Sequence, residues 1–140
     1  MTSIPYIQIS QVMKTEVHLV DPMMPVRQAM ALMHEKGVNS LIIERRDEKD
    51  EMGLLTVSDI AREVIAQNRS MDRIDVYEVM SKPVLTLAAE MDIRYAVRLL
   101  SRFGVSRGLV VDHDRNLVGI ATLRDMVLAY VHHEEGGVEA

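Results

Sequence analysis

Cysteine and tryptophan are absent from this sequence, and it has one phenylalanine. Without cysteine, disulfides and thiolate metal ligands are excluded. No apolar run approaches the roughly 20 residues of a membrane helix, and the start lacks the features of a signal peptide. The scarcity of aromatics leaves no stacking platform for single-stranded nucleic acid, and a net charge of −5 disfavours non-specific DNA binding. We therefore expect a cytoplasmic protein that does not act on nucleic acids.

Catalytic patterns are missing as well. The sequence has no Ser-His-Asp order with a nucleophile elbow, no Walker loop and no zinc-ligand spacing. The stretch "HHEE" (132–135) does not predict a metal site, because adjacent residues on a helix do not face one point. The sequence thus predicts a protein that is not an enzyme and holds no metal or catalytic cofactor.

The residues that are present suit a globular fold. Hydrophobic residues make up 48% of the 140 positions and charged residues 26%, which is ordinary for a soluble domain. This length fits one domain, or two half-domains that share a core. The 11 methionines predict flexible core filling and, in part, an adaptable interface.

An internal repeat organises the chain. The two copies are offset by 67 residues up to a charged loop and by 66 residues after it, so a one-residue gap falls in a loop. Ordered identities of this kind indicate a duplication. The clearest matching pairs are Met13 with Met80, Arg27 with Arg94, Gly37 with Gly104, Gly53 with Gly119, Thr56 with Thr122, and Asp59 with Asp125.

Each copy predicts the order β-α-β-β-α, which defines an α+β fold. Apolar positions at helical spacing end at Gly37 and Gly104, and short β-prone runs surround them. One copy alone leaves an apolar sheet face open, so we expect two β-α-β-β-α repeats packed about a pseudo-twofold axis with the helices outside. The predicted boundaries are 9–67 for repeat one, 68–75 for a linker, 76–133 for repeat two and 134–140 for a flexible tail.

The same strand-to-helix corner occurs in both copies. "GLLTVSDIA" (53–61) and "GIATLRDMV" (119–127) place a Thr three residues before an Asp where a helix begins. This spacing is that of a helix capping box. A helix N-terminus also attracts phosphate, and a carboxylate accepts hydrogen bonds from a ribose diol. Both interpretations, a cap and a binding site, remain open, and one Thr can serve both.

The chain resembles the CBS-domain family, whose tandem pairs are called Bateman modules. The likeness rests on "VM" (12–13 and 79–80), "GVNSLIIE" and "GVSRGLVVD", and the two corners, and it covers residues 9–133. It implies a stand-alone regulatory protein that binds an adenosyl ligand such as AMP, ADP, ATP or S-adenosylmethionine in clefts between the repeats. It also implies a homodimer formed through helices of both repeats, and an unnamed protein target.

The resemblance further implies which residues line each cleft. In the family the Asp of one repeat receives ribose, while the other repeat's Gly-Val turn lines the adenine and phosphate. We favour the first cleft, because Lys82 and Arg107 add positive charge there, although Arg107 could instead form an ion pair. The first cleft comprises Thr56, Ser58, Asp59, Lys82, Leu85, Val105, Ser106 and Arg107. The second comprises His18, Val38, Asn39, Ser40, Thr122, Arg124 and Asp125.

One alternative function stays open. A CBS pair whose clefts are empty or vestigial would act as a protein–protein interaction module. Binding of an adenosyl ligand distinguishes the two functions.

Overall fold

The computed structural model describes residues 6–136, which form two compact units. One unit is Val17–Val84; the other joins the described residues before Val17 to those from Leu85 onward. The predicted element order is confirmed in both, and each unit contains one three-stranded sheet. No helix within residues 6–136 has the length and apolar character needed to cross a membrane.

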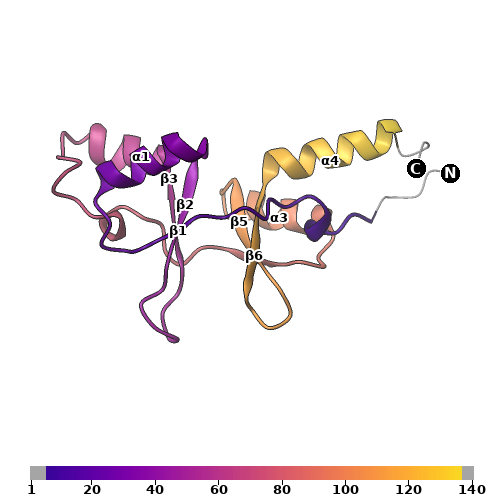
Figure 1. Ribbon diagram of the computed structural model, residues 1–140. Helices are drawn as coiled ribbons and strands as arrows, with labels where there is room; N and C mark the ends of the chain where they lie inside the picture. Colours follow the sequence, from indigo (N-terminus) through magenta and orange to yellow (C-terminus); the bar gives the residue numbers. More distant parts are fainter. Residues whose placement is uncertain (1–5, 137–140) are drawn as a thin grey trace. The chain divides into compact units, whose positions relative to one another are not determined.

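The Val17–Val84 unit carries repeat one (Figure 1). Its sheet has the order β1-β2-β3, with β1 parallel to β2 and β2 antiparallel to β3. A parallel pair needs a crossover connection, and α1 supplies it. The elements are β1 (Leu19–Val20), α1 (Val26–Lys36), β2 (Ser40–Ile43), β3 (Gly53–Thr56) and α2 (Val57–Ile60).

Helix α1 is fixed by an apolar stripe and by its end. Val26, Ala29 and Met33 are buried at helical spacing against the sheet. Gly37 then adopts φ 66°, the left-handed conformation that ends many helices and that glycine adopts without strain. Both features were predicted from the sequence.

The second helix of repeat one is less regular than predicted. The α2 segment is followed directly by a π-helical segment, Ala61–Ile65, rather than by a continuous α-helix. Ile60 and Val64 are nonetheless both buried in the core of this unit. Sequence periodicity cannot detect the change, because the apolar spacing of four residues suits either helix.

The second unit repeats this topology with longer strands and a longer second helix. Its sheet has the order β4-β5-β6, and its core includes Ile93, Leu100 and Met126. The elements are β4 (Thr86–Ala88), α3 (Ile93–Arg102), β5 (Arg107–Val111), β6 (Leu117–Thr122) and α4 (Leu123–Gly136). Helix α4 therefore passes the predicted start of the tail at 134, and positions 137–140 lie outside the described residues.

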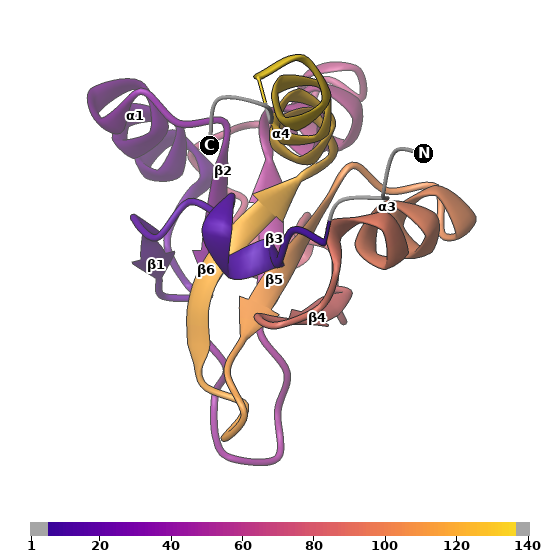
Figure 2. The ribbon, with the colours of Figure 1, turned by 90° about the vertical axis from the view of Figure 1, so that its right-hand side faces the viewer.

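The first segment of each repeat packs on the other repeat's sheet. Lys14 exchanges two backbone hydrogen bonds of 2.9 Å with Ile120 on β6, and Figure 2 shows this N-terminal segment beside β6. Ser81 does the same with Leu54 on β3, also at 2.9 Å. The compact units therefore do not coincide with the sequence repeats, because the first segment of each repeat belongs to the unit that holds the other repeat's sheet.

Glycine allows this close approach. A Cβ added at Gly119 would lie 2.7 Å from the Lys14 carbonyl oxygen and 2.7 Å from the Met13 sulfur. At Gly53 the nearest atom would be the Met80 sulfur, at 2.5 Å. The "VM" motif and the glycine of the corner motif are thus two sides of one contact.

Candidate ligand-binding corners

The corner of repeat one is a complete capping box. The Asp59 amide donates to Thr56 Oγ1 at 3.1 Å, and the Thr56 amide donates to Asp59 Oδ2 at 2.9 Å. Arg62 Nη2 donates to the second oxygen, Asp59 Oδ1, at 2.9 Å. Asp59 is 5% exposed. Both of its carboxylate oxygens therefore already have partners within the repeat.

The corner of repeat two forms half of that box. The Asp125 amide donates to Thr122 Oγ1 at 3.1 Å. Asp125 Oδ2 is buried and has no hydrogen-bond partner among the described residues. The Lys14 Nζ lies 3.9 Å from this oxygen, at ion-pair distance. A buried acceptor without a hydrogen bond is costly unless a ligand or water supplies a donor.

One sequence difference accounts for part of the contrast. Arg62 follows Asp59 by three positions, which places both side chains on one helix face. The residue equivalent to Arg62 in repeat two is Leu128, which cannot donate a hydrogen bond. Repeat two therefore lacks the arginine that binds the carboxylate in repeat one, which is one source of the inequality between the two corners.

The Gly-Val turn of repeat two lies beside its own corner. Arg107 on β5 is the register partner of Thr122 on β6, and the Leu123 amide donates to the Ser106 carbonyl at 2.8 Å. Arg107 Nε is buried and, like Asp125 Oδ2, has no hydrogen-bond partner in the described part of the chain. This unit thus has a cationic donor, Arg107 Nε, and an anionic acceptor, Asp125 Oδ2, that both lack hydrogen bonds near the end of β6.

Lys82 lies away from the corner of repeat one. Its Nζ forms an ion pair with Asp50 in the 44–52 loop, and Arg46 Nε donates to the same carboxylate at 3.1 Å. The hydrogen bond from Lys82, with those from Arg46, holds the pKa of Asp50 well below its usual value. Because Ser81 pairs with Leu54, Lys82 is level with the start of β3 rather than with Thr56 at its end.

The other predicted residues divide between the units. In the first, the Asn39 carbonyl accepts from the Val57 amide at 3.1 Å and Ser40 pairs with Thr56, while Ser58 is exposed. In the second, Val105 and Arg124 are exposed. Three more of these residues make backbone hydrogen bonds. The His18 carbonyl accepts from the Ile42 amide, the Val38 amide donates to the Met33 carbonyl, and the Leu85 carbonyl accepts from the Leu109 amide. Pairing of either corner with the other repeat's turn stays a prediction.

Two residues of these corners were missed from the sequence. Arg62 was detectable, because an arginine three positions after a helix N-terminal Asp is at salt-bridge spacing. Lys14 was not, since its approach to Asp125 depends on the backbone pairing of the preceding segment with β6. Among residues 6–136, no three His, Asp or Glu side chains gather as metal ligands.

Comparison with known proteins identifies the family. The CBS domain model matches residues 9–66 and 76–132, which together are most of the chain. The chain belongs to the CBS-domain family and carries two tandem repeats, as the sequence predicted. CBS pairs are regulatory modules.

Among curated proteins, an uncharacterised protein of Methanopyrus kandleri is 30% identical over 122 residues. The match covers 86% of this chain and 61% of that relative. Against two other curated relatives the chain spans less than half of their length. The relatives are thus longer than the part they share with this chain.

Solved structures share the fold. A hexameric CBS-CP12 protein from bloom-forming cyanobacteria has a TM-score of 0.84 and 30% identity, covering 91% of this chain and 73% of its own. The CBS domain pair of a protein bound to 5′-methylthioadenosine and S-adenosylmethionine has a TM-score of 0.76 and 23% identity, covering 91% and 98%. At 23% identity, the similarity to this second structure shows that the two chains share a fold.

Proposed function

We propose that this CBS pair is a regulatory, non-enzymatic ligand sensor that binds an adenosyl nucleotide of the AMP, ADP or ATP class at the corner of repeat two. The observation that supports this proposal is a pair of buried polar atoms without hydrogen bonds, Asp125 Oδ2 and Arg107 Nε. Each lacks a partner that a nucleotide can supply. S-adenosylmethionine, a second adenosyl ligand, has the ribose but not the phosphate.

The chemistry of the corner fits the two ends of a nucleotide. The Asp125 carboxylate accepts hydrogen bonds from the vicinal ribose hydroxyls. Arg107 provides a planar donor for a phosphate, and the exposed Lys14 ammonium adds charge. The N-terminus of α4 starts at Leu123 and contributes its partial positive charge.

This proposal reverses the order expected from the sequence. The Asp59 carboxylate would have to release Arg62 and the Thr56 amide before it could receive ribose. Asp125 Oδ2 has no such bond to break. The corner of repeat one therefore acts first as a helix cap.

A solved structure of similar fold supports the choice of an adenosyl ligand. The CBS pair of similar fold described above was solved with two adenosyl compounds. In our proposal, ligand binding favours one conformation of the pair, and a protein target distinguishes the conformations by the surface they present.

The first prediction concerns ligand-induced stabilisation. AMP, ADP, ATP or S-adenosylmethionine at 100 times its Kd is expected to add about 2.7 kcal/mol to the unfolding free energy. A thermal-shift panel measures this as a rise in Tm of several degrees. Asp125→Ala is expected to abolish the rise, and Arg107→Ala to weaken the phosphorylated ligands more than S-adenosylmethionine.

The matched control is Asp59→Ala, which removes the equivalent carboxylate of repeat one. It lowers the basal Tm by removing a cap but is expected to leave the ligand-induced rise intact. If Asp59→Ala abolishes the rise and Asp125→Ala does not, the sequence-based order is correct. If no adenosyl ligand raises the Tm, the sensor proposal fails. Release of ADP during incubation with ATP would argue for an enzyme instead.

A helical face favours self-association as a second role. A groove of about 350 Å³ runs along α3 and α4 and is lined mainly by apolar side chains. Val127 is 50% exposed and Val131 42% exposed on α4. Exposed apolar surface of this kind is typical of protein interfaces. We therefore include in the proposal a homodimer formed through helices such as α3 and α4. The same surface would be used if the protein acts as a protein–protein interaction module.

The second prediction tests this dimer. Val127→Glu places a charge on the groove without disturbing a buried side chain, so the fold measured by circular dichroism should persist. Sedimentation velocity is expected to show a dimer for the wild type and a monomer for the variant. Met23→Glu, at an apolar position 63% exposed in the turn before α1, is the control and should stay dimeric. A monomeric wild type at micromolar concentration would refute the dimer.

A further inference from the structure

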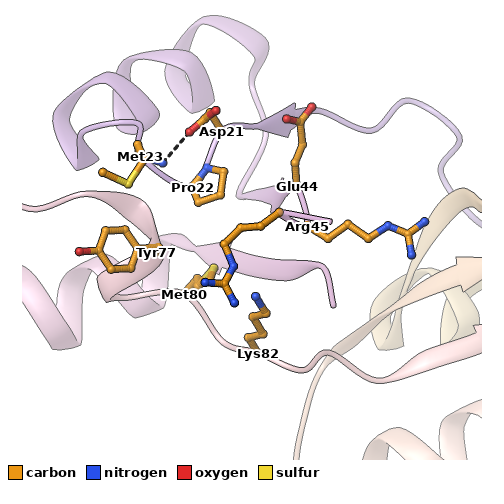
Figure 3. Close-up of a pocket in the computed structure, with 9 residues that line it drawn as sticks. Asp21, Pro22, Met23, Glu44, Arg45, Tyr77, Met80 and Lys82 are labelled. Atoms are coloured by element: carbon orange, nitrogen blue, oxygen red, sulfur yellow. Dashed lines mark hydrogen bonds between the residues drawn. The ribbon is translucent and has the colours of Figure 1, made fainter. Parts of the chain in front are cut away.

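The Val17–Val84 unit contains a cavity that the corners do not use. Its volume is about 820 Å³, within the size range of small-molecule sites. All of its lining residues belong to the Val17–Val84 unit (Figure 3). They are Asp21, Pro22 and Met23 from the turn before α1, Glu44, Arg45 and Arg46 after β2, and Tyr77, Met80 and Lys82 from the segment after the predicted linker.

The cavity lies at the opposite end of the sheet from the corner. The residues Glu44–Arg46 follow the last residue of β2, whereas Thr56 pairs with Ser40, its first residue. Four strand residues span on the order of 10 Å. A ligand in this cavity would therefore not contact the Asp59 carboxylate.

One side of the cavity is apolar and flat. Tyr77 is 47% exposed, and Figure 3 shows its ring facing the cavity together with the side chains of Met23 and Met80. A solvent-accessible tyrosine ring flanked by thioethers favours a flat, polarisable partner. These side chains belong to different segments, so together they form a wall rather than a single exposed residue.

The other side offers positioned cations. Asp50 accepts one hydrogen bond from Arg46 Nε and one from Lys82 Nζ. An arginine has five N–H donors and a lysine three, so each keeps donors for a ligand while Asp50 fixes its place. Arg45 makes no hydrogen bond or ion pair with the described residues and adds a third positive charge.

Two lining carboxylates must be considered against these cations. The Asp21 carboxylate accepts from the Met23 amide at 2.8 Å, which commits it to the turn. In Figure 3 the carboxylates of Asp21 and Glu44 lie on the side of the cavity away from Lys82. The negative charge of these two lining residues is therefore separated from the Lys82 end, where the Asp50 carboxylate stands against the positive charges of Arg46 and Lys82.

We propose that this cavity is a second ligand site, which binds a small organic anion carrying a flat ring, of the aryl phosphate or aryl carboxylate class. The ring stacks on Tyr77 between the methionines, and the anionic group contacts Arg46 and Lys82. None of its lining residues belongs to the adenosyl site proposed at Asp125.

The methionines make the test specific. The full chain labelled with ¹³C at methionine methyls is titrated with phenyl phosphate, with inorganic phosphate and with phenol. Phenyl phosphate is expected to shift the Met23 and Met80 methyl signals saturably, while Met33 and Met126, buried in the two cores, stay unchanged. Phosphate and phenol each satisfy one wall and should bind at least tenfold more weakly.

Variants then assign the binding to the two walls. Tyr77→Ala and Arg46→Ala are each expected to weaken phenyl phosphate about tenfold, since they remove the stacking surface and a charged donor. Arg27→Ala removes an exposed arginine that pairs with Asp72 in the same unit and should have no effect. Equal binding of inorganic phosphate, unshifted Met23 and Met80 signals, or an unchanged affinity of Tyr77→Ala would each overturn the proposal.

Discussion

Gly119→Ala is expected to lower the free energy of unfolding by about 2–3 kcal/mol, the upper part of the range for overpacking. The added Cβ would meet the Lys14 carbonyl oxygen at 2.7 Å. A backbone atom held by two hydrogen bonds to Ile120 cannot turn aside as a side chain can. The N-terminal segment must therefore move off β6, and the contact between Lys14 and Asp125 is lost with it. Urea unfolding measures the loss of stability.

The equivalent glycine of repeat one is the control. At Gly53 the nearest atom is the Met80 sulfur, and the nearest backbone atom, the Ser81 oxygen, lies at 3.3 Å. Gly53→Ala is therefore expected to cost less, and Met80→Ala should relieve part of that cost, whereas Met13→Ala should relieve little at Gly119. Equal losses at the two glycines would contradict the backbone explanation.

Asp92→Ala is expected to destabilise the protein by about 2–3 kcal/mol, because it removes a helix cap worth ~1 kcal/mol and charged hydrogen bonds worth ~1.5 kcal/mol or more. Asp92 is 3% exposed and caps α3, where Oδ1 accepts from the Arg94 amide at 3.0 Å. Arg94 Nε and Nη2 donate to Oδ2 at 3.0 and 2.8 Å. The position in repeat one equivalent to Asp92 is Pro25, which makes no side-chain cap. Repeat two thus depends on this carboxylate in a way that repeat one does not.

The dependence on Asp92 should vary with pH. Burial alone would raise the pKa of Asp92, but the hydrogen bonds and charge of Arg94 lower it below the usual 3.8. The carboxylate therefore contributes its stability above pH 3.8, and the contribution is lost as the pH falls through the lowered value. Denaturant unfolding should show a large difference between wild type and Asp92→Asn at pH 7 and a smaller one near pH 3. A difference that does not change with pH would exclude the ionised pair as its cause.

Most of the fold could be predicted because local signals agreed with one another. The duplication located the first helix of each repeat, and Gly37 and Gly104 marked where these two helices end. Strand β6 spans the predicted "LVGIAT". The π-helical segment Ala61–Ile65 could not be predicted, since its apolar spacing also fits an α-helix. Nor could the packing of the Lys14 segment on β6, because backbone pairing over that separation leaves no periodic signal.

The sequence predicted which residue types form the candidate site, but not which hydrogen bonds their side chains make. The sequence located both Thr-x-x-Asp corners, and the structure shows that each Thr hydroxyl accepts from the Asp amide. The sequence did not reveal that Arg62 donates a hydrogen bond to Asp59, or that Asp125 Oδ2 has no hydrogen-bond partner among the described residues. That difference arises from the three-dimensional surroundings of two near-identical motifs.

The placement of the first segment of repeat one also sets an order of events during synthesis. Every strand and helix of the Val17–Val84 unit is complete once Val84 has left the ribosome. Residues 9–14 are made earlier but must wait for β6 and for the Ala89–Met91 turn, whose carbonyls accept from the Ser10 and Ile9 amides. Residues 9–14 are therefore among the last described residues to reach their partners, and they stay unpaired in the nascent chain until β6 is made.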